Sequence, residues 1–362
     1  MKEIIFSLLI VFIVAGCAES TEQWTQFGTN NQNTNYTTNT FRIDSPVLKW
    51  NYKTDGYVDS SPAIVDEVVY FGSEDGTLYA LDSETGKVIW RFATDRGVPT
   101  SPTVEKGVVY FGSRDNYLYA LNAENGEEIW RFRTRGAIRS SPKIADGLVY
   151  FGSSDYNFYA VDINTGQEAW HKSTRGAIIS APAVSEGLVF FGSWDNHLYA
   201  LDLQTGEEIW KFQTENSVDS SPAIYDDMIL FGSWDRHLYA LDLQTGKEKW
   251  RFQTDGRVTS SPAIAHELVV FGSHDYHLYA LDIYSGDELW NYRALGPFLS
   301  SAAISGRTVF VSNWRNHLHA INIDNGGELW NFQTGGQMAS SPAVVNNVVF
   351  FGSRDEYLYA IE

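Results

Sequence analysis

The sequence predicts an all-β protein: an eight-bladed β-propeller of four-stranded antiparallel blades with 40-residue repeats. Two observations carry this prediction. First, tryptophan recurs every 40 residues, and the same order of short apolar runs and turns fills each interval. A period near 40 with four β segments per unit is typical of a propeller blade. Second, the last unit lacks its final run, and a matching run precedes the first unit. The repeating tryptophans are Trp50, Trp90, Trp130, Trp170, Trp210, Trp250, Trp290 and Trp330.

Each unit contains four runs of strand length, which the first unit illustrates. The small residues at 60–63 (SSPA) suit an innermost strand, because blades crowd together near the axis. Residues 68–73 (VVYFGS) and 78–82 (LYALD) are rich in β-branched and aromatic side chains, which favour strands. These runs are apolar almost without alternation, as expected of a sheet covered on both faces. The fourth run carries the tryptophan, and large aromatic side chains fill the wedge between neighbouring sheets.

The turns between these runs also have local reasons. The turn at 82–86 (DSETG) ends in a glycine, and the same glycine recurs in the later units, which suggests a hairpin turn that needs positive φ. Asp75 and its equivalents follow the Phe-Gly-Ser element, where an aspartate is expected to bond nearby backbone amides. In the seventh unit this element is degraded to Val311-Ser312-Asn313.

The ends of the chain predict how the ring closes. The chain stops at Glu362, directly after the third run of the last unit. The unpartnered tryptophan run at 47–54 (VLKWNYKT) precedes the first inner run. We expect this N-terminal run to complete the eighth blade, which would remove both exposed sheet edges. A single propeller domain is therefore expected over residues 41–362.

The N-terminus predicts export and a lipid anchor. An apolar run at 4–16 has the length of a signal-peptide core and is too short for a comfortable membrane span. It ends in Val14-Ala15-Gly16-Cys17, which resembles the lipobox of bacterial lipoproteins. That resemblance implies removal of residues 1–16 and acylation of Cys17, the one cysteine of the chain; several acyl chains anchor a protein stably. Ala18, in place of aspartate, favours the outer membrane. The polar stretch 17–40 is expected to be a tether.

Composition narrows the partners. Hydrophobic residues make up 43% and charged residues 20%, a globular composition. A net charge of −19 would repel phosphates, so nucleic acid is not an expected partner.

The motif at 80–90 (ALDSETGKVIW) resembles the tryptophan-docking motif of pyrroloquinoline quinone (PQQ)-type propellers, and it recurs through nearly all of the chain after residue 40. This resemblance implies the fold. It leaves function more open, because the repeat occurs in quinoprotein dehydrogenases, in sensor domains and in the BamB family of outer-membrane β-barrel assembly lipoproteins. The dehydrogenases are much longer, with insertions that build the cofactor pocket. They commonly have adjacent disulfide-bonded cysteines over the cofactor, and carboxylate and amide ligands to calcium.

No catalytic, metal or cofactor site is expected. His197, His237, His277 and His317 share one position in successive units, but equivalent turns of adjacent blades lie about 10 Å apart, too far for one metal ion. The repeated Ser-Ser-Pro has no matching histidine, and packing explains it better than a nucleophile. PQQ with calcium remains the alternative cofactor.

A candidate interaction surface comes from positions where the repeats differ. A basic arc beside an acidic one is a plausible docking surface, although a solvated rim of mixed charge explains it equally well. Additional tryptophans in the turns suggest an aromatic rim. The apolar loop 295–299 of the seventh unit suggests a further contact, although decay of the repeat, with Phe298 tucked into the channel mouth, explains it equally well. The candidate residues are Arg96, Arg114, Arg135, Arg139, Arg175, Trp194, Trp234, Phe298 and Trp314.

The function expected from the BamB resemblance is that of a non-catalytic scaffold on the periplasmic side of the outer membrane. Its expected partners are the β-barrel assembly machinery and unfolded outer-membrane proteins. Two alternatives stay open: a PQQ-dependent dehydrogenase, and a sensor or propeller that binds a small ligand or a glycan.

Overall fold

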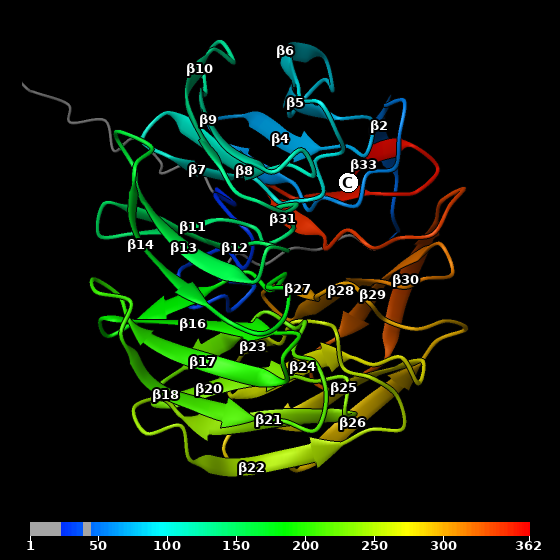
Figure 1. Ribbon diagram of the computed structural model, residues 1–362. Coiled ribbons are helices and arrows are strands. Elements are labelled where there is room, and N and C mark those ends of the chain that lie inside the picture. Colours follow the sequence, from blue (N-terminus) through cyan, green and yellow to red (C-terminus); the bar gives the residue numbers. More distant parts are fainter. Residues whose placement is uncertain (1–22, 39–44) are drawn as a thin grey trace, which may run out of the picture.

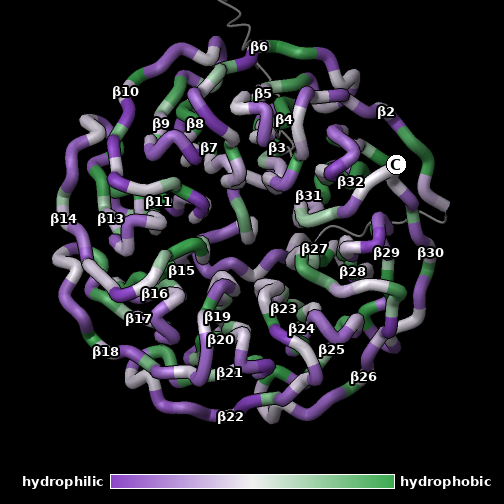
Figure 2. Tube along the Cα trace, turned by 45° about the vertical axis from the view of Figure 1, so that its right-hand side comes forward, coloured by the Kyte–Doolittle hydropathy of each residue, from purple (hydrophilic) through white to green (hydrophobic). Residues whose placement is uncertain are grey.

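The computed structural model describes residues 23–38 and 45–362, and every regular element within them is a β-strand. Eight antiparallel sheets form a ring of blades, as predicted (Figure 1). Figure 2 shows the outermost strand of each blade at the circumference and the innermost strands around the axis. The predicted signal peptide, Cys17 and residues 41–44 lie outside the described residues. No helix long and apolar enough to cross a membrane occurs in the described ranges.

Blades are numbered here in chain order, each from its innermost strand outward. The first four blades contain β3 (Ala63–Val65), β4 (Val68–Gly72), β5 (Thr77–Asp82) and β6 (Val88–Ala93); β7 (Thr103–Glu105), β8 (Val108–Gly112), β9 (Tyr117–Asn122) and β10 (Glu128–Arg133); β11 (Lys143–Ala145), β12 (Leu148–Gly152), β13 (Asn157–Asp162) and β14 (Glu168–Ser173); β15 (Ala183–Ser185), β16 (Leu188–Ser193), β17 (His197–Asp202) and β18 (Glu208–Gln213).

The last four blades follow the same pattern, with two additions from the N-terminal part of the chain, β1 in blade 7 and β2 in blade 8. They contain β19 (Ala223–Tyr225), β20 (Met228–Gly232), β21 (His237–Asp242) and β22 (Glu248–Gln253); β23 (Ala263–Ala265), β24 (Leu268–Gly272), β25 (His277–Asp282) and β26 (Glu288–Arg293); β27 (Ala303–Ser305), β28 (Thr308–Ser312), β29 (His317–Asn322), β30 (Glu328–Gln333) and β1 (Tyr36–Thr37); β31 (Ala343–Val345), β32 (Val348–Gly352), β33 (Tyr357–Ile361) and β2 (Leu48–Lys53).

The two ends of the chain meet in blade 8, as the sequence predicts. β2 pairs antiparallel with β33, and Trp50 lies opposite Ala360. Beyond this ladder, the backbone groups of Val47 and Glu362 bond each other in both directions at 2.8 and 2.9 Å. The ring is therefore closed by hydrogen bonds between the beginning and the end of the propeller.

The hydrophobic core lies between the blades. The two middle strands of each blade are buried on both faces, whereas the outermost strand is largely exposed and turns its tryptophan and one further aromatic side chain inward. Phe71 and Tyr79 of blade 1 stack at 5.1 Å, and Tyr52 of blade 8 meets Tyr79 at 5.4 Å. The same aromatic contact recurs around the ring, which explains the high aromatic content.

The repeating tryptophans join each blade to the next. Trp50 donates its indole N–H to the carbonyl of Ser83 in blade 1, at 2.9 Å. Its ring lies on Gly86, where φ is +68° and an added Cβ would come within 2.7 Å of the ring. Glycine is required there for both reasons. Trp170 is an exception: its ring N–H is buried without a partner, and the equivalent carbonyl, of Leu203, accepts the hydroxyl of Tyr150.

The Ser-Ser-Pro elements form a second set of links around the axis. In seven of the eight pairs of neighbouring blades, the backbone N–H at the second position of this element bonds the serine hydroxyl at the same position of the next blade, as Ser61 does to Ser101 at 3.1 Å. Ser341 completes the circle by donating to Ser61 at 2.9 Å. The circle is interrupted once in the described ring, between Ser141 and Ala181, because alanine has no hydroxyl. These buried serines therefore serve architecture.

The N-terminal segment, residues 23–38, corrects one prediction. The sequence predicts a tether over 17–40, but the described part of it runs along the innermost strands near the centre of the ring (dark blue in Figure 1). Its carbonyls accept backbone N–H groups from blades 1, 2, 4, 5, 6 and 7, at 2.8–2.9 Å. β1 adds to β27 in parallel, with Tyr36 opposite Ile304. The segment was taken for a tether because its contacts use backbone and amide groups, which leave no apolar pattern in the sequence.

Candidate functional site

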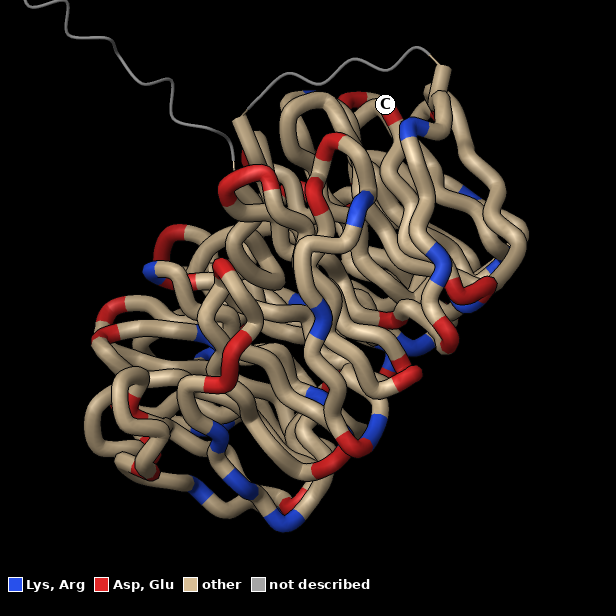
Figure 3. Tube along the Cα trace, turned by 90° about the horizontal axis from the view of Figure 1, so that it is seen from above, with Lys and Arg blue, Asp and Glu red and all other residues tan. Residues whose placement is uncertain are grey.

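The ring has two ends with different chemistry. The loop face carries the loops equivalent to 54–60 and the turns equivalent to 73–76. The plugged face carries the opposite turns, equivalent to 66–67 and 83–86, and the N-terminal segment lies across the channel. Figure 3 shows acidic residues spread over the turns with lysine and arginine between them. Each end offers a candidate site.

On the plugged side, Lys143 holds the N-terminal segment. Its ammonium group donates to the carbonyls of Phe27 and Asn30, both at 2.9 Å, and to Oδ1 of Asn33 at 2.6 Å. The amide of Asn33 in turn donates to the carbonyls of Pro182 and Pro222. Lys143 is completely buried, and this burial lowers its pKa to about 7. Sequence reasoning missed this residue, although a lysine where other units have alanine or threonine was a visible signal.

On the loop face, most of the predicted basic arc is present as free cations. Arg96, Arg135, Arg139 and Arg175 are exposed, and no carboxylate of the described residues lies within ion-pair distance of their guanidinium groups. Arg114 differs, because it forms an ion pair with Glu74 of blade 1 at 2.6 Å. Four of the five predicted arginines therefore remain available to a partner.

One carboxylate beside the basic arc is neutralised within the chain. Asp59 accepts two hydrogen bonds from Arg354 of blade 8, at 2.9 and 2.7 Å. The same guanidinium lies over Trp314, 4.4 Å from the ring centre. Trp314 is therefore half-buried under a cation–π contact.

Four blades away, Asp219 forms a similar cluster with different partners. Its carboxylate accepts the ring N–H of Trp234 at 2.9 Å, and its other oxygen is buried without a hydrogen bond. Burial raises the pKa of Asp219 to about 6. Arg257 covers Trp234 at 4.1 Å, and Trp194 lies 6.4 Å from Trp234 with 41% of its surface exposed. Of the three predicted rim tryptophans, Trp194 is the exposed one.

Phe298 is not at the surface, so that part of the predicted surface is wrong. Its side chain is fully buried between blades 6 and 7, at the position that Val58 or Val258 occupies in other blades. A Cβ added to Gly272 would come within 2.4 Å of the Phe298 Cβ, so the fit is close. Leu295 is the exposed residue of this loop, at 83%. The register of the repeat, rather than local hydrophobicity, decides which side chain points inward.

The turn residues behave as structural groups. Asp75 accepts the backbone N–H of Thr77 and the hydroxyl of Tyr79, both at 2.8 Å, which confirms the predicted role of this aspartate. In the seventh unit, Asn313 takes this role by accepting the backbone N–H of His317 at 3.1 Å, and it also donates to His319 at 2.8 Å. Burial lowers the pKa of His319. No cluster of three or more potential metal-ligating side chains occurs in the part of the chain that the structure describes.

The comparisons with known proteins agree with this architecture. The sequence profile of the family described as "Outer membrane protein assembly factor BamB" matches residues 18–117, 75–181, 174–302 and 293–362. No curated protein matches the chain. BamB from Moraxella catarrhalis is 19% identical with a TM-score of 0.76, covering 88% of this chain and 99% of that protein.

Two dehydrogenase structures share the fold as well. The quinohemoprotein alcohol dehydrogenase from Comamonas testosteroni is 16% identical with a TM-score of 0.83, covering 94% of this chain and 80% of that protein. A europium-containing methanol dehydrogenase is 14% identical with a TM-score of 0.82, covering 94% of this chain and 98% of that protein. At these identities the likeness concerns the fold alone.

Proposed function

The chain belongs to the outer membrane protein assembly factor BamB family, and we propose that it is a non-catalytic scaffold in the assembly of outer-membrane β-barrel proteins. In this proposal it is exported, anchored by lipid at Cys17, and faces the periplasm. Its partners are subunits of the β-barrel assembly machinery and unfolded outer-membrane proteins.

The observation that carries the proposal is the set of free guanidinium groups on the loop face. Arg96, Arg135, Arg139 and Arg175 lie in three successive loops, in a chain with a net charge of −19. Cations without internal partners in such a chain fit an acidic surface on a partner protein. The rigid ring presents them at fixed spacing, so little ordering entropy opposes docking.

Affinity isolation tests this proposal directly. The full, lipidated chain should recover β-barrel assembly subunits from detergent-solubilised outer membranes. Arg135→Glu combined with Arg139→Glu should reduce this recovery, and the reduction should be largest at low salt. The matched control is Arg251→Glu, because Arg251 is exposed on an outermost strand and already paired with Glu248. Failure to recover any such subunit contradicts the proposed role, and unchanged recovery by the double variant contradicts the proposed surface.

The lipid anchor has its own test. Cys17→Ala should abolish acylation, which mass spectrometry of the N-terminal peptide measures, and should release the protein from membranes. Persistent membrane association of the variant would mean that another element anchors the chain.

The dehydrogenase alternative finds little support in the donor set of the loop-face mouth. Asp59 and Asp219 lie four blades apart, and each already accepts hydrogen bonds, from Arg354 and Trp234 respectively. These carboxylates therefore do not converge on one calcium ion, which needs six to eight oxygen ligands. Calorimetry with PQQ and calcium tests this directly, and stoichiometric binding would favour the dehydrogenase. A glycan sensor would instead show ligand-induced protection of Trp194.

A further inference from the structure

Between blades 2 and 4, the N-terminal segment leaves the inner strand of blade 3 uncovered. Its carbonyls accept the N–H groups of Val104 in blade 2 and Val184 in blade 4. Between these contacts the chain turns through residues 26–31, and it makes no backbone bond to blade 3. Ile144, the equivalent residue of β11, points its N–H away from β12 and has no hydrogen-bond partner among the described residues. The blade 3 strand thus keeps a free inner edge.

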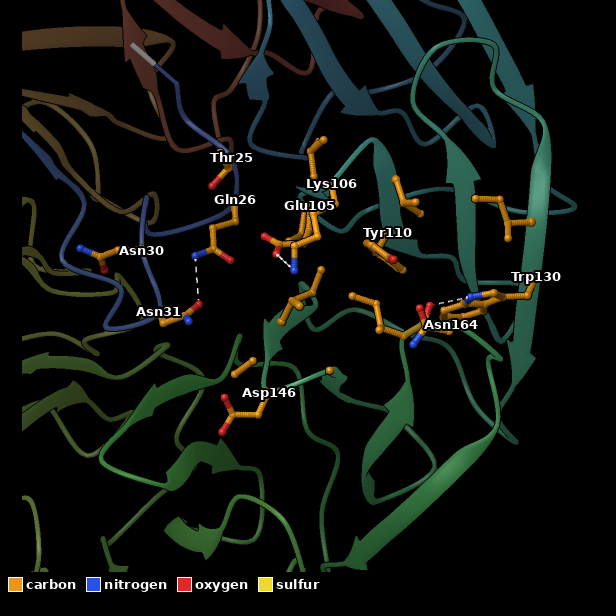
Figure 4. A pocket seen from close by; sticks show the side chains of 18 residues that line it. Thr25, Gln26, Asn30, Asn31, Glu105, Lys106, Tyr110, Trp130, Asp146 and Asn164 are labelled. Carbon is orange, nitrogen blue, oxygen red and sulfur yellow. Dashed lines mark hydrogen bonds and ion pairs between the residues drawn. The ribbon is translucent and has the colours of Figure 1, made fainter. Parts of the chain in front are cut away.

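A cavity lies at this free edge. It has a volume of about 930 Å³ and opens between blades 2 and 3 on the plugged face (Figure 4). Ile144 and Ala145 form part of its wall, and Gln26 and Asn31 of the N-terminal segment form another part. This volume is at the upper end of the usual range for ligand pockets, roughly 300–1,000 Å³.

Side-chain bridges cross two other grooves of the same face and are missing from this one. Between blades 4 and 5, Gln244 donates to Glu186, and between blades 5 and 6, Tyr284 donates to Asp226. The equivalent pair between blades 2 and 3 is Asn164 and Lys106. Lys106 forms an ion pair with its neighbour Glu105 instead, and the Asn164 side chain has no partner in the described residues.

A second unsatisfied group faces the same cavity. In blades 1 and 3, the hydroxyls of Tyr70 and Tyr150 donate to a carbonyl of the next blade, at 3.2 and 3.0 Å. Tyr110 of blade 2 lines the cavity, and its hydroxyl makes no hydrogen bond within the described chain. The cavity therefore presents one backbone N–H and one hydroxyl, each without an internal partner.

We propose that this cavity binds an extended peptide segment of a partner protein, whose backbone carbonyl accepts the N–H of Ile144. The strongest argument is internal to the ring. In six other blades the same inner-edge N–H is bonded to a carbonyl of a polar peptide, which is the N-terminal segment itself. Strand edges recognise peptides through such main-chain bonds. The amides and charges at the cavity mouth then serve the polar side chains of the peptide. This function goes beyond the proposed scaffold role and does not depend on it.

The experiment uses the full chain in detergent and an acetylated, amidated peptide with the sequence of residues 34–37 (TNYT), which the chain itself places on blades 6 and 7. Hydrogen exchange resolved to single amides should first show that Ile144 exchanges faster than Val104 and Val184. Saturating peptide, on the order of 10 mM, should then slow exchange at Ile144 about tenfold. Calorimetry measures the dissociation constant in parallel.

Two pairs of variants locate the site. Ala145→Trp fills the cavity and should weaken peptide binding at least about tenfold, whereas Ser185→Trp, at the equivalent position of blade 4, should not. Tyr110→Phe should weaken binding by a few-fold while leaving thermal stability unchanged, because it removes a single unbonded hydroxyl. Tyr150→Phe should leave peptide binding unchanged. The proposal is wrong if peptide leaves Ile144 exchange unaltered, or if N,N′-diacetylchitobiose protects Ile144 when the peptide does not.

Discussion

Replacing Lys143 with methionine is the sharpest test of the plugged architecture. Methionine has similar length and fills the buried site, but it donates no hydrogen bond. The substitution leaves the carbonyls of Phe27 and Asn30 and the amide oxygen of Asn33 without their donor. Each buried acceptor that loses its partner costs about 1–3 kcal/mol. With partial relaxation, Lys143→Met should lower the free energy of unfolding by about 3–5 kcal/mol at pH 7.

The pH dependence gives this prediction a distinctive sign. Burial lowers the pKa of Lys143 from its usual 10.5 to about 7. Between these two values the unfolded chain binds the proton and the folded chain does not, so the stability of the wild type rises with pH. Below pH 7 both states are protonated, and folding bears the whole cost of burying the ammonium. Relative to Lys143→Met, the wild type should therefore gain about 2–3 kcal/mol between pH 7 and pH 9.

Urea unfolding followed by tryptophan fluorescence measures these differences. Hydrogen exchange should also accelerate at Ile224 and Ile264, whose N–H groups bond the N-terminal segment. Lys249→Met is the control, because Lys249 forms its ion pair with Asp227 at the surface and should contribute less than about 1 kcal/mol. The reasoning is refuted if Lys143→Met costs less than about 1 kcal/mol, or if its deficit shrinks as the pH rises.

Three further predictions concern the ring itself. Burial raises the pKa of Asp219 from 3.8 to about 6, so the unfolded chain loses this proton at a lower pH than the folded chain does. Relative to Asp219→Asn, the wild type should therefore lose about 3 kcal/mol of stability between pH 3.8 and pH 6, which urea titrations measure. Gly86→Ala should destabilise by about 2 kcal/mol more than Gly147→Ala in thermal unfolding, because both glycines have positive φ but a Cβ at Gly147 meets no atom within 4 Å. Ser341→Ala removes the acceptor of the buried Ser301 N–H and should cost about 1–3 kcal/mol by the same measurement.

The repeat made most of the fold predictable, because the same pattern of strands and turns occurs eight times in the sequence. Blade number, strand order and the pairing of residues 47–54 with the C-terminus all follow from the spacing of one residue type. Phe298 shows where this kind of prediction fails. Its apolar loop suggested a contact surface, whereas the equivalent residues of other units, such as Val58 and Val258, are buried and indicate an inward side chain. A position should be compared with its equivalents before its own hydrophobicity is interpreted.

The N-terminal segment was less predictable for a different reason. Its bonds join backbone carbonyls to strand edges, and any polar sequence with the right backbone path could form them. Its asparagines and threonines therefore led to the prediction of a tether. The one sign of these contacts in the sequence is a side chain with a fixed geometric role, Lys143 in the inner strand of blade 3. Sequence patterns indicate well which apolar side chains are buried, but they indicate poorly which partners the backbone N–H and C=O groups bond.

Three departures from the repeat lie together around blade 3. Ala181 removes the acceptor that the N–H of Ser141 would use, Lys143 replaces a small inner residue, and Ile144 lacks the carbonyl that its equivalents in six other blades receive. A lysine side chain reaching the axis needs acceptors, and the turn at residues 26–31 supplies the carbonyls of Phe27 and Asn30. The same turn makes no backbone bond to β11, and Gln26 and Asn31 line the cavity beside that strand. The turn at residues 26–31 therefore both binds Lys143 and lines the cavity, so shortening Lys143 should alter the peptide site as well as the stability of the ring.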